Sequence, residues 1–209
     1  MRTADPELHR RRCAEIAAAA ARAFLAKGFH GTSMQDVARE AGVSMGLLYR
    51  YYADKAALIA AAASVDRQAQ LIALRGLAGA DDPAAELLRL TREALEEART
   101  PGYVDLVAEV AAEACRNPAV AAVLIEDDRE TRRALADALR AQQVAGRLRP
   151  DVDPDGFAEA WTTLVDGLML RARLDPATDP ARALSALAAT LAALRPDELV
   201  AAVPPIVNM

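Results

Sequence analysis

The chain is poor in the residues that most catalytic and metal sites use. Its 209 residues include one tryptophan, four tyrosines, three phenylalanines, two histidines and two cysteines. Cys13 and Cys115 lie in unrelated segments without CxxC spacing, so neither a disulfide framework nor a zinc site is indicated. The N-terminal segment lacks the apolar region and cleavage site of a signal peptide, and no segment approaches the roughly 20 apolar residues that cross a bilayer. We expect a cytoplasmic protein without a metal or cofactor.

Catalytic motifs are also missing. The sequence has no HExxH, GxSxG, GxGxxG, P-loop or Glu-x-x-His motif, and His9 and His30 are its only histidines. Each histidine is more simply explained as a surface or packing residue than as a catalytic base. We therefore assign no catalytic residue and do not expect an enzyme.

The composition favours helices along most of the chain. Hydrophobic residues make up 53%, much of it alanine, and no segment rich in valine, isoleucine or threonine alternates with a period of two. This hydrophobic content is ample for a sizeable core in one large or two small domains. We predict an all-α protein.

A repeated pair marks the helix starts, since Asp or Asn followed by Pro combines an N-cap side chain with a residue suited to the first helical position. The pairs are Asp5-Pro6, Asp82-Pro83, Asn117-Pro118, Asp153-Pro154 and Asp179-Pro180, with Thr100-Pro101 a close relative. Glycine at positions 28 and 146 is expected to end helices. Nine helices are predicted near 6–27, 34–41, 45–52, 55–75, 84–98, 102–115, 118–145, 154–174 and 180–194. Residues 201–209 are expected to be irregular.

Charge is distributed unevenly between the two ends. Residues 1–55 carry nine basic and six acidic groups, a net of +3, whereas the remaining 154 residues carry 16 basic and 24 acidic groups, a net of −8. A basic N-terminal part on an acidic body suggests that only this part meets a polyanion. We predict a DNA-binding domain over residues 1–54 and a helical regulatory and dimerisation domain over residues 55–209.

A helix-turn-helix is predicted within the basic part. Ser33 and Asp36 have the spacing of a capping box at the start of a short helix. Gly42 then permits a left-handed exit, and Ser44 can cap the next helix through its hydroxyl. Two short helices joined by a turn of three or four residues with glycine are typical of this motif.

The second of these helices has an unusual outer face. Leu48 and Tyr52 lie four residues apart and are expected to face the core. The outward residues are then Met45, Gly46, Leu47, Tyr49 and Arg50. Apolar side chains on such a face suit contact with thymine methyls in a DNA groove. Hydroxyl and ammonium groups around it are suited to phosphate oxygens, namely those of Thr32, Ser33, Tyr49, Tyr51 and Lys55.

Residues 12–58 resemble the tetracycline-repressor (TetR) family of transcriptional regulators. The matching residues are Ile16, Ala19, Ala20, Phe24, Gly28, Thr32, Val37, Ala38, Ala41, Gly42, Val43, Ser44, Gly46, Tyr49, Tyr51, Lys55 and Leu58. The resemblance implies that bases are approached by Met45, Gly46 and Leu47, with Gln35 and Arg50. It implies that the DNA backbone is held by Thr32, Ser33, Tyr49, Tyr51 and Lys55, beside the capping Ser44.

The later part of the chain resembles the helical regulatory domain of many members of this family. The matching segments are Asn117-Pro118, Gly146-Arg147-Leu148, Asp153-Pro154 and Asp166-Gly167-Leu168. The resemblance implies a homodimer in which the helices near 154–174 and 180–194 form a four-helix bundle with those of the partner. An apolar band in the last helix favours this role, although a core within one chain would also explain it: Ala183, Leu184, Leu187, Ala188, Leu191 and Leu194. A dimer matches a palindromic operator, with recognition helices roughly 34–36 Å apart.

A pocket for a small-molecule inducer is expected among the helices between residues 55 and 174. Its apolar candidates are Tyr103, Cys115, Phe157, Trp161 and Met169, and its polar candidates are Glu109, Glu113 and Arg116. Each of these is also readily explained as an ordinary core residue or a solvated charge.

The sequence therefore predicts a ligand-responsive regulator, a repressor, that binds double-stranded DNA as a homodimer and is released by an unknown inducer. Two alternatives stay open. One is a helical interaction module that does not bind DNA, and the other is a regulator of the same family that acts without an inducer or as an activator.

Overall fold

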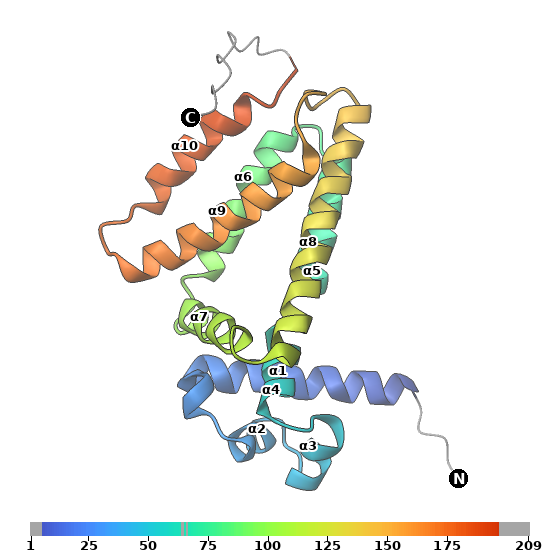
Figure 1. Ribbon diagram of the computed structural model, residues 1–209, viewed down its shortest axis with the longest axis vertical. Coiled ribbons are helices and arrows are strands. Elements are labelled where there is room, and N and C mark those ends of the chain that lie inside the picture. The colour runs from blue at the N-terminus through green and yellow to red at the C-terminus, as the bar shows by residue number, and fades with distance from the viewer. Residues whose placement is uncertain (1–5, 64, 66, 197–209) are drawn as a thin grey trace. The chain divides into compact units, whose positions relative to one another are not determined.

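The computed structural model describes residues 6–63, 65 and 67–196, and these residues contain helices but no strand. Within this described part, ten α-helices and one short 3-10 helix follow one another from α1 (Pro6–Gly31) to α10 (Pro180–Ala192). The α-helices are labelled in Figure 1. The predicted all-α class is confirmed. The irregular segment predicted for 201–209 lies outside the described residues.

The other elements lie between these two helices. They are α2 (Met34–Glu40), α3 (Met45–Tyr51), α4 (Lys55–Ala63), α5 (Arg67–Gly76), η1 (Leu77–Gly79), α6 (Pro83–Glu97), α7 (Tyr103–Ala114), α8 (Pro118–Val144) and α9 (Pro154–Leu174). Among the described residues, none of these helices is long and apolar enough to span a membrane.

The helix count differs from the nine that the sequence predicts. The single helix expected over 55–75 is divided into α4 and α5, and the short η1 follows. Residues 55–75 contain neither glycine nor proline, so the residues that usually mark a break are absent there. The break was therefore not predictable from helix-breaking residues.

The Asp-Pro and Asn-Pro pairs at 82–83, 117–118, 153–154 and 179–180 start helices as predicted, while Asp5 lies outside the described residues. Asp153 accepts a hydrogen bond from the backbone N–H of Asp155 at 3.1 Å, and α9 begins at the following proline. Asp179 likewise accepts from the N–H groups of Ala181 and Arg182 at 2.9 and 3.2 Å. These bonds satisfy backbone donors that have no partner within the helix.

The chain forms two compact units that are not consecutive in sequence. The first comprises Met1–Ile72 with Glu96–Thr131, and the second comprises Ala73–Leu95 with Arg132–Met209. The boundaries between the units fall within α5, near the end of α6 and within α8. The predicted division after residue 54 concerns DNA binding and regulation, and it stays a prediction.

The core of the first unit joins the N-terminal helices to α7 and α8. Phe24 of α1, Leu48 of α3 and Leu58 of α4 have no exposed surface, and Val110 of α7 and Val120 of α8 belong to the same buried cluster. Burial of a large apolar side chain contributes about 1.5–3 kcal/mol. The short α2 and α3, which would be marginal alone, are therefore held in place by this core.

The second unit has a separate apolar core with a few satisfied polar groups. Leu87 of α6, Leu135 and Leu139 of α8 and Leu148 are among its fully buried side chains. Gln142 is also fully buried, and its amide donates to the carbonyl oxygens of Leu77 and Ala80 at 2.5 and 2.8 Å. These bonds connect α8 to the chain before α6.

Candidate nucleic-acid interface

The start of α2 is fixed by reciprocal capping. The Ser33 hydroxyl accepts from the backbone N–H of Asp36 at 3.1 Å, and the Asp36 carboxylate accepts from the backbone N–H of Ser33 at 3.0 Å. The predicted capping box is thus present, with aspartate in place of the usual glutamate.

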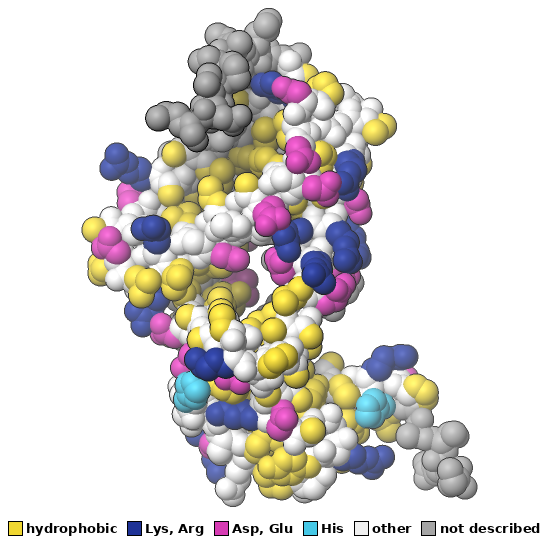
Figure 2. Space-filling view, in the orientation of Figure 1, with side chains coloured by type: hydrophobic (Ala, Val, Ile, Leu, Met, Phe, Trp, Pro, Cys, Tyr) yellow, Lys and Arg dark blue, Asp and Glu magenta, His cyan; other side chains and the backbone are white. Residues whose placement is uncertain are grey.

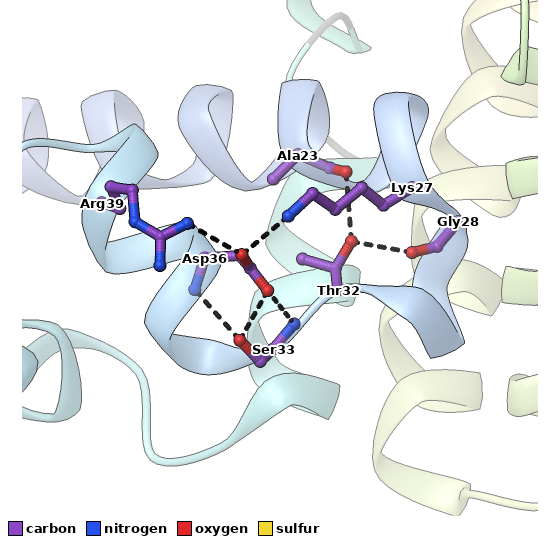
Figure 3. A network of polar contacts seen from close by, with 7 residues as sticks. All are labelled: Ala23, Lys27, Gly28, Thr32, Ser33, Asp36 and Arg39. Carbon is purple, nitrogen blue, oxygen red and sulfur yellow. Dashed lines mark hydrogen bonds and ion pairs between the residues drawn. The ribbon is translucent and has the colours of Figure 1, made fainter.

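Asp36 also connects α2 to α1. Its Oδ1 atom lies 2.7 Å from Lys27 Nζ and 3.2 Å from Arg39 Nη1. Figure 3 draws both contacts. The hydrogen bond from Lys27, followed by those from Ser33, holds the pKa of the Asp36 carboxyl well below its usual range. The carboxylate therefore stays charged at neutral pH and fixes α2 against α1.

The turn between α2 and α3 has the predicted left-handed glycine. Gly42 has φ of 64°, and a Cβ there would meet no atom within 4 Å. The backbone conformation rather than limited space is therefore what favours glycine. The N–H of Val43 donates to the Ala38 oxygen at 2.9 Å, and the Ser44 hydroxyl accepts from the N–H of Leu47 at 3.2 Å. The two helices form a helix-turn-helix.

Helix α3 has one buried side and one exposed side. Leu48 is fully buried, while Gly46, Tyr49 and Arg50 are exposed and Leu47 is partly exposed. Hydrophobic side chains gather on the surface over α2 and α3 in Figure 2. Met45 differs from the prediction, because it is partly buried and packs against the core of the unit.

The end of α3 is held by the first half of α1. The Tyr52 hydroxyl donates to the carbonyl oxygen of Cys13 at 2.9 Å, and burial together with this bond raises the pKa of Tyr52 to about 12. The ring of Tyr51 lies 5.0 Å from the ring of His9. Tyr52 thus faces inward as predicted, and Tyr51 is partly buried, with its ring against α1.

Thr32 is not at the surface, which corrects the expectation that its hydroxyl faces DNA phosphate. Thr32 is 2% exposed, and its hydroxyl oxygen lies 3.1 Å from the Ala23 carbonyl oxygen and 2.8 Å from the Gly28 carbonyl oxygen. Figure 3 draws both contacts. The hydroxyl therefore donates to backbone carbonyl oxygens in the C-terminal half of α1. Of the other predicted polar contacts on α2, Ser33 and Gln35 are exposed.

Lys55 lies at the start of α4 beside aromatic and acidic groups. Its Nζ atom is 4.3 Å from the centre of the Phe29 ring, a cation–π arrangement. Burial lowers the pKa of Lys55, and the charges of Glu109 and Glu113 on α7 oppose that shift. The ammonium that is predicted to bind phosphate therefore already has anionic neighbours.

Glu109 contacts the end of α1. Its carboxylate accepts a hydrogen bond from the backbone N–H of Phe29. Gly28 beside it has φ of 72°, which ends the regular helix as predicted, and a Cβ at this position would lie 3.2 Å from Glu109 Oε1. The Glu109 carboxylate is therefore already bound to the backbone at the end of α1, which differs from the polar ligand contact predicted for it in an inducer pocket.

The predicted inducer residues are divided between the two units. Tyr103, Glu109, Glu113, Cys115 and Arg116 lie on α7 or just after it in the first unit, whereas Phe157, Trp161 and Met169 lie on α9 in the second.

Within the second unit, the Trp161 indole is 7% exposed and its N–H donates to Thr91 Oγ1 at 3.1 Å. In the first unit, Cys115 is exposed and Arg116 lies 3.5 Å from Glu113. The inducer site stays a prediction. In the described part of the chain no cluster of three or more His, Cys, Asp or Glu residues is placed to bind a metal.

Sequence reasoning missed three contacts that shape this interface. They are the ion pair of Lys27 with Asp36, the tilted ring contact of His9 with Tyr51 and the hydrogen bond from the Phe29 N–H to Glu109. The first joins residues nine apart and could have been suspected from opposite charges at the two ends of one turn. The last spans 80 positions, and no local pattern indicates it.

Comparison with known proteins agrees with this geometry. Residues 16–62 match the family described as bacterial regulatory proteins, tetR family, and residues 83–196 match the C-terminal domain of BetI-type transcriptional repressors. The chain is 32% identical to the HTH-type transcriptional regulator UidR of Escherichia coli strain K12 over 139 residues, which cover 65% of this chain and 68% of UidR.

Two further relatives cover more of the chain. The HTH-type transcriptional repressor Rv1474c of Mycobacterium tuberculosis is 29% identical over 178 residues, covering 83% of this chain and 87% of the repressor. The structure of GusR from Salmonella enterica superposes with a TM-score of 0.72 at 26% identity, covering 93% of this chain and 99% of GusR. These relatives are transcriptional regulators, and the chain is accordingly a regulator of transcription and not an enzyme. It belongs to the TetR family of bacterial regulatory proteins.

Proposed function

We propose that this regulator is a repressor that binds a palindromic DNA operator as a homodimer and is released by a small molecule. The observation that supports DNA binding best is the exposed side of α3. It presents Gly46, Leu47, Tyr49 and Arg50 to solvent, while Leu48 on the opposite side is fully buried. A helix anchored in this way can enter a major groove without losing its packing.

The proposed contacts fall into two classes. Leu47, Gly46 and Arg50, with Gln35 of α2 and the edge of Met45, approach bases, because apolar side chains suit thymine methyls and polar ones suit base edges.

The second class binds phosphates. It comprises Ser33, Ser44, Tyr49, Tyr51 and Lys55, through hydroxyl groups and one ammonium. Tyr49 is 51% exposed, so its hydroxyl is available.

The proposed dimer uses α9 and α10. Leu164, Leu170 and Leu174 on α9 are 43%, 42% and 71% exposed, an apolar surface that a second copy would cover. In the predicted band of α10, Leu191 is buried and the other members are partly exposed. The band therefore packs within its own unit and still leaves apolar surface for a partner.

The proposed inducer acts by differential affinity. A ligand that binds better to a conformation whose recognition helices do not match the operator spacing lowers operator occupancy, and DNA lowers ligand affinity by the same factor. Phe157, Trp161 and Met169 on α9 are candidates for its contacts in the second unit.

DNA binding is tested by fluorescence anisotropy with duplexes selected from a random pool and with an unselected duplex. We expect the logarithm of affinity to fall linearly with the logarithm of salt concentration, by about 0.9 for each phosphate contact. Lys55→Ala is expected to weaken binding to both duplexes, whereas Leu47→Ala is expected to alter mainly the sequence preference. Binding that does not depend on salt would instead support an interaction module without DNA.

The dimer is tested by light scattering on the purified chain and on a Leu170→Glu variant. We expect the wild-type chain to have twice the protomer mass. The variant is expected to dissociate into monomers at protein concentrations at which the wild type is still dimeric, because a carboxylate in an apolar interface loses its hydration. Glu159→Gln on the exposed side of α9 serves as a control with a change of charge outside the leucine surface. A wild-type chain that remains monomeric at all working concentrations would refute the proposed assembly.

A further inference from the structure

Lys55 lies where three helices of the first unit meet. Helix α7 packs against both α1 and α4. From α4, Lys55 places its Nζ atom 4.3 Å from the centre of the Phe29 ring, and from α7, Glu109 accepts the backbone N–H of the same phenylalanine. The proposed phosphate ligand and a carboxylate of α7 thus share one neighbour, Phe29.

Two carboxylates of α7 act on the Lys55 ammonium. Glu109 and Glu113 are four residues apart and therefore lie on the same side of the helix. Both stabilise the charged form of Lys55 and oppose the effect of burial on its pKa. An ammonium attracted to these carboxylates gains less from a DNA phosphate, because the phosphate itself is repelled by the same negative charges.

We propose that Glu109 and Glu113 weaken the contact between Lys55 and DNA phosphate, so that the position of α7 sets the DNA affinity of the chain. This inference rests on the proposed function of Lys55. Glu109 and Glu113 are positioning residues for that contact and do not themselves bind DNA.

The two carboxylates differ in how strongly they act on the Lys55 ammonium. Glu109 is fixed by the N–H of Phe29. Glu113 accepts from the Asn117 side chain at 3.2 Å and lies 3.5 Å from an Arg116 nitrogen, so its charge is partly compensated by the arginine. Glu109 therefore has the larger effect on Lys55.

This arrangement gives α7 a direct electrostatic influence on the interface. A displacement that carries the carboxylates away from Lys55 strengthens phosphate binding, and one that brings them closer weakens it. Because the influence operates through charge, it decreases as salt shortens the screening length from about 10 Å at 0.1 M to about 3 Å at 1 M.

The test is a double-mutant cycle measured by anisotropy with an unselected, labelled DNA duplex at low salt. Glu109→Gln keeps an oxygen that accepts the N–H of Phe29 but removes the charge, and it is expected to tighten binding roughly threefold. Glu113→Gln is expected to tighten binding by a smaller factor. In a Lys55→Met background, both substitutions are expected to have almost no effect on affinity.

Asp105→Asn is the matched control, since it removes the same charge from the same helix one turn before Glu109, whereas the charges that oppose the pKa shift of Lys55 are those of Glu109 and Glu113. It is expected to change affinity less than Glu109→Gln. Thermal unfolding of each variant monitors folding, and Glu113→Gln carries the test if Glu109→Gln is unstable.

The outcomes separate this inference from the proposed function. Unchanged affinity in both glutamine variants overturns the inference while DNA binding stands. An equal gain of affinity in the Lys55→Met background also overturns it, because the effect then comes from total charge. If the wild-type chain shows no salt-dependent duplex binding at all, the proposed function fails together with the inference.

Discussion

The replacement of Thr32 by valine tests whether this residue supports the fold or binds DNA. Valine has nearly the shape of threonine but lacks the hydroxyl. In the structure that hydroxyl lies within hydrogen-bonding distance of the Ala23 and Gly28 carbonyl oxygens, at 3.1 and 2.8 Å. The substitution removes these contacts and leaves the packed volume almost unchanged.

The expected loss of stability depends on the burial of Thr32 and on its single hydroxyl proton. One hydroxyl proton is shared by two acceptors, so the loss corresponds to about one hydrogen bond, or about 1 kcal/mol. Because Thr32 is only 2% exposed, water does not readily replace the donor, which raises the expected loss to about 1–2 kcal/mol. For a chain of this length, that loss lowers the midpoint of thermal unfolding by roughly 2–8 °C.

The assay pairs stability with DNA affinity. Thermal and urea unfolding, followed by circular dichroism, are measured for the wild-type chain, Thr32→Val and Thr32→Ser. Serine keeps the hydroxyl and loses only a methyl group, so its stability is expected to lie between the other two. Anisotropy below the unfolding transition is expected to show nearly the same DNA affinity for all three proteins.

A different pattern would refute the structural role of Thr32. If Thr32→Val unfolds at the wild-type temperature but binds DNA at least tenfold more weakly, while Thr32→Ser binds normally, the hydroxyl acts on phosphate and not on the carbonyls of α1.

Three further predictions concern other contacts. Ser33→Ala removes the cap of α2 and is expected to lower the free energy of unfolding by about 1 kcal/mol in urea, whereas equal midpoints would show that the cap contributes little. Lys27 lowers the pKa of Asp36 in the folded state. The ionised Asp36 carboxylate therefore stabilises the fold fully above its unfolded-state pKa of about 4, and this stabilisation is lost as the pH falls toward the folded-state pKa. Asp36→Asn should therefore lose less stability than wild type between about pH 5 and pH 2, and parallel urea midpoints across this range would contradict the assignment. Trp161→Phe removes the N–H donor to Thr91 and is expected to lower the free energy of unfolding by about 1–3 kcal/mol. A double-mutant cycle with Thr91→Val measures the coupling of the two side chains, and additive losses would contradict the predicted hydrogen bond.

Local chemistry predicted much of the fold. The pair Asp153-Pro154 fixed the start of α9, and the helix runs over the predicted residues 154–174. The capping box at Ser33 and the left-handed turn at Gly42 were likewise readable, because each depends on residues within a few positions. These features made the helix-turn-helix predictable without knowledge of the rest of the chain.

Contacts between distant segments were not predictable in this way. The burial of Thr32 depends on how α2 packs against α1, and that of Met45 on how α3 packs against the core. The partner of the Phe29 N–H lies 80 residues later, so a helical period in α7 gives no reason to choose Glu109. The pattern shows which faces are apolar, but the neighbour of each face is set by the tertiary structure.

The discontinuous first unit matters for anyone building chimeric regulators. The family match begins at residue 16, yet the acceptor of the Tyr52 hydroxyl is the Cys13 carbonyl, three positions earlier. At the other end, Val110 and Val120 complete the core around Leu58. An N-terminal segment that is transferred to another protein and ends near residue 63 would leave that core uncovered. A functional chimera must therefore also contain residues 96–131.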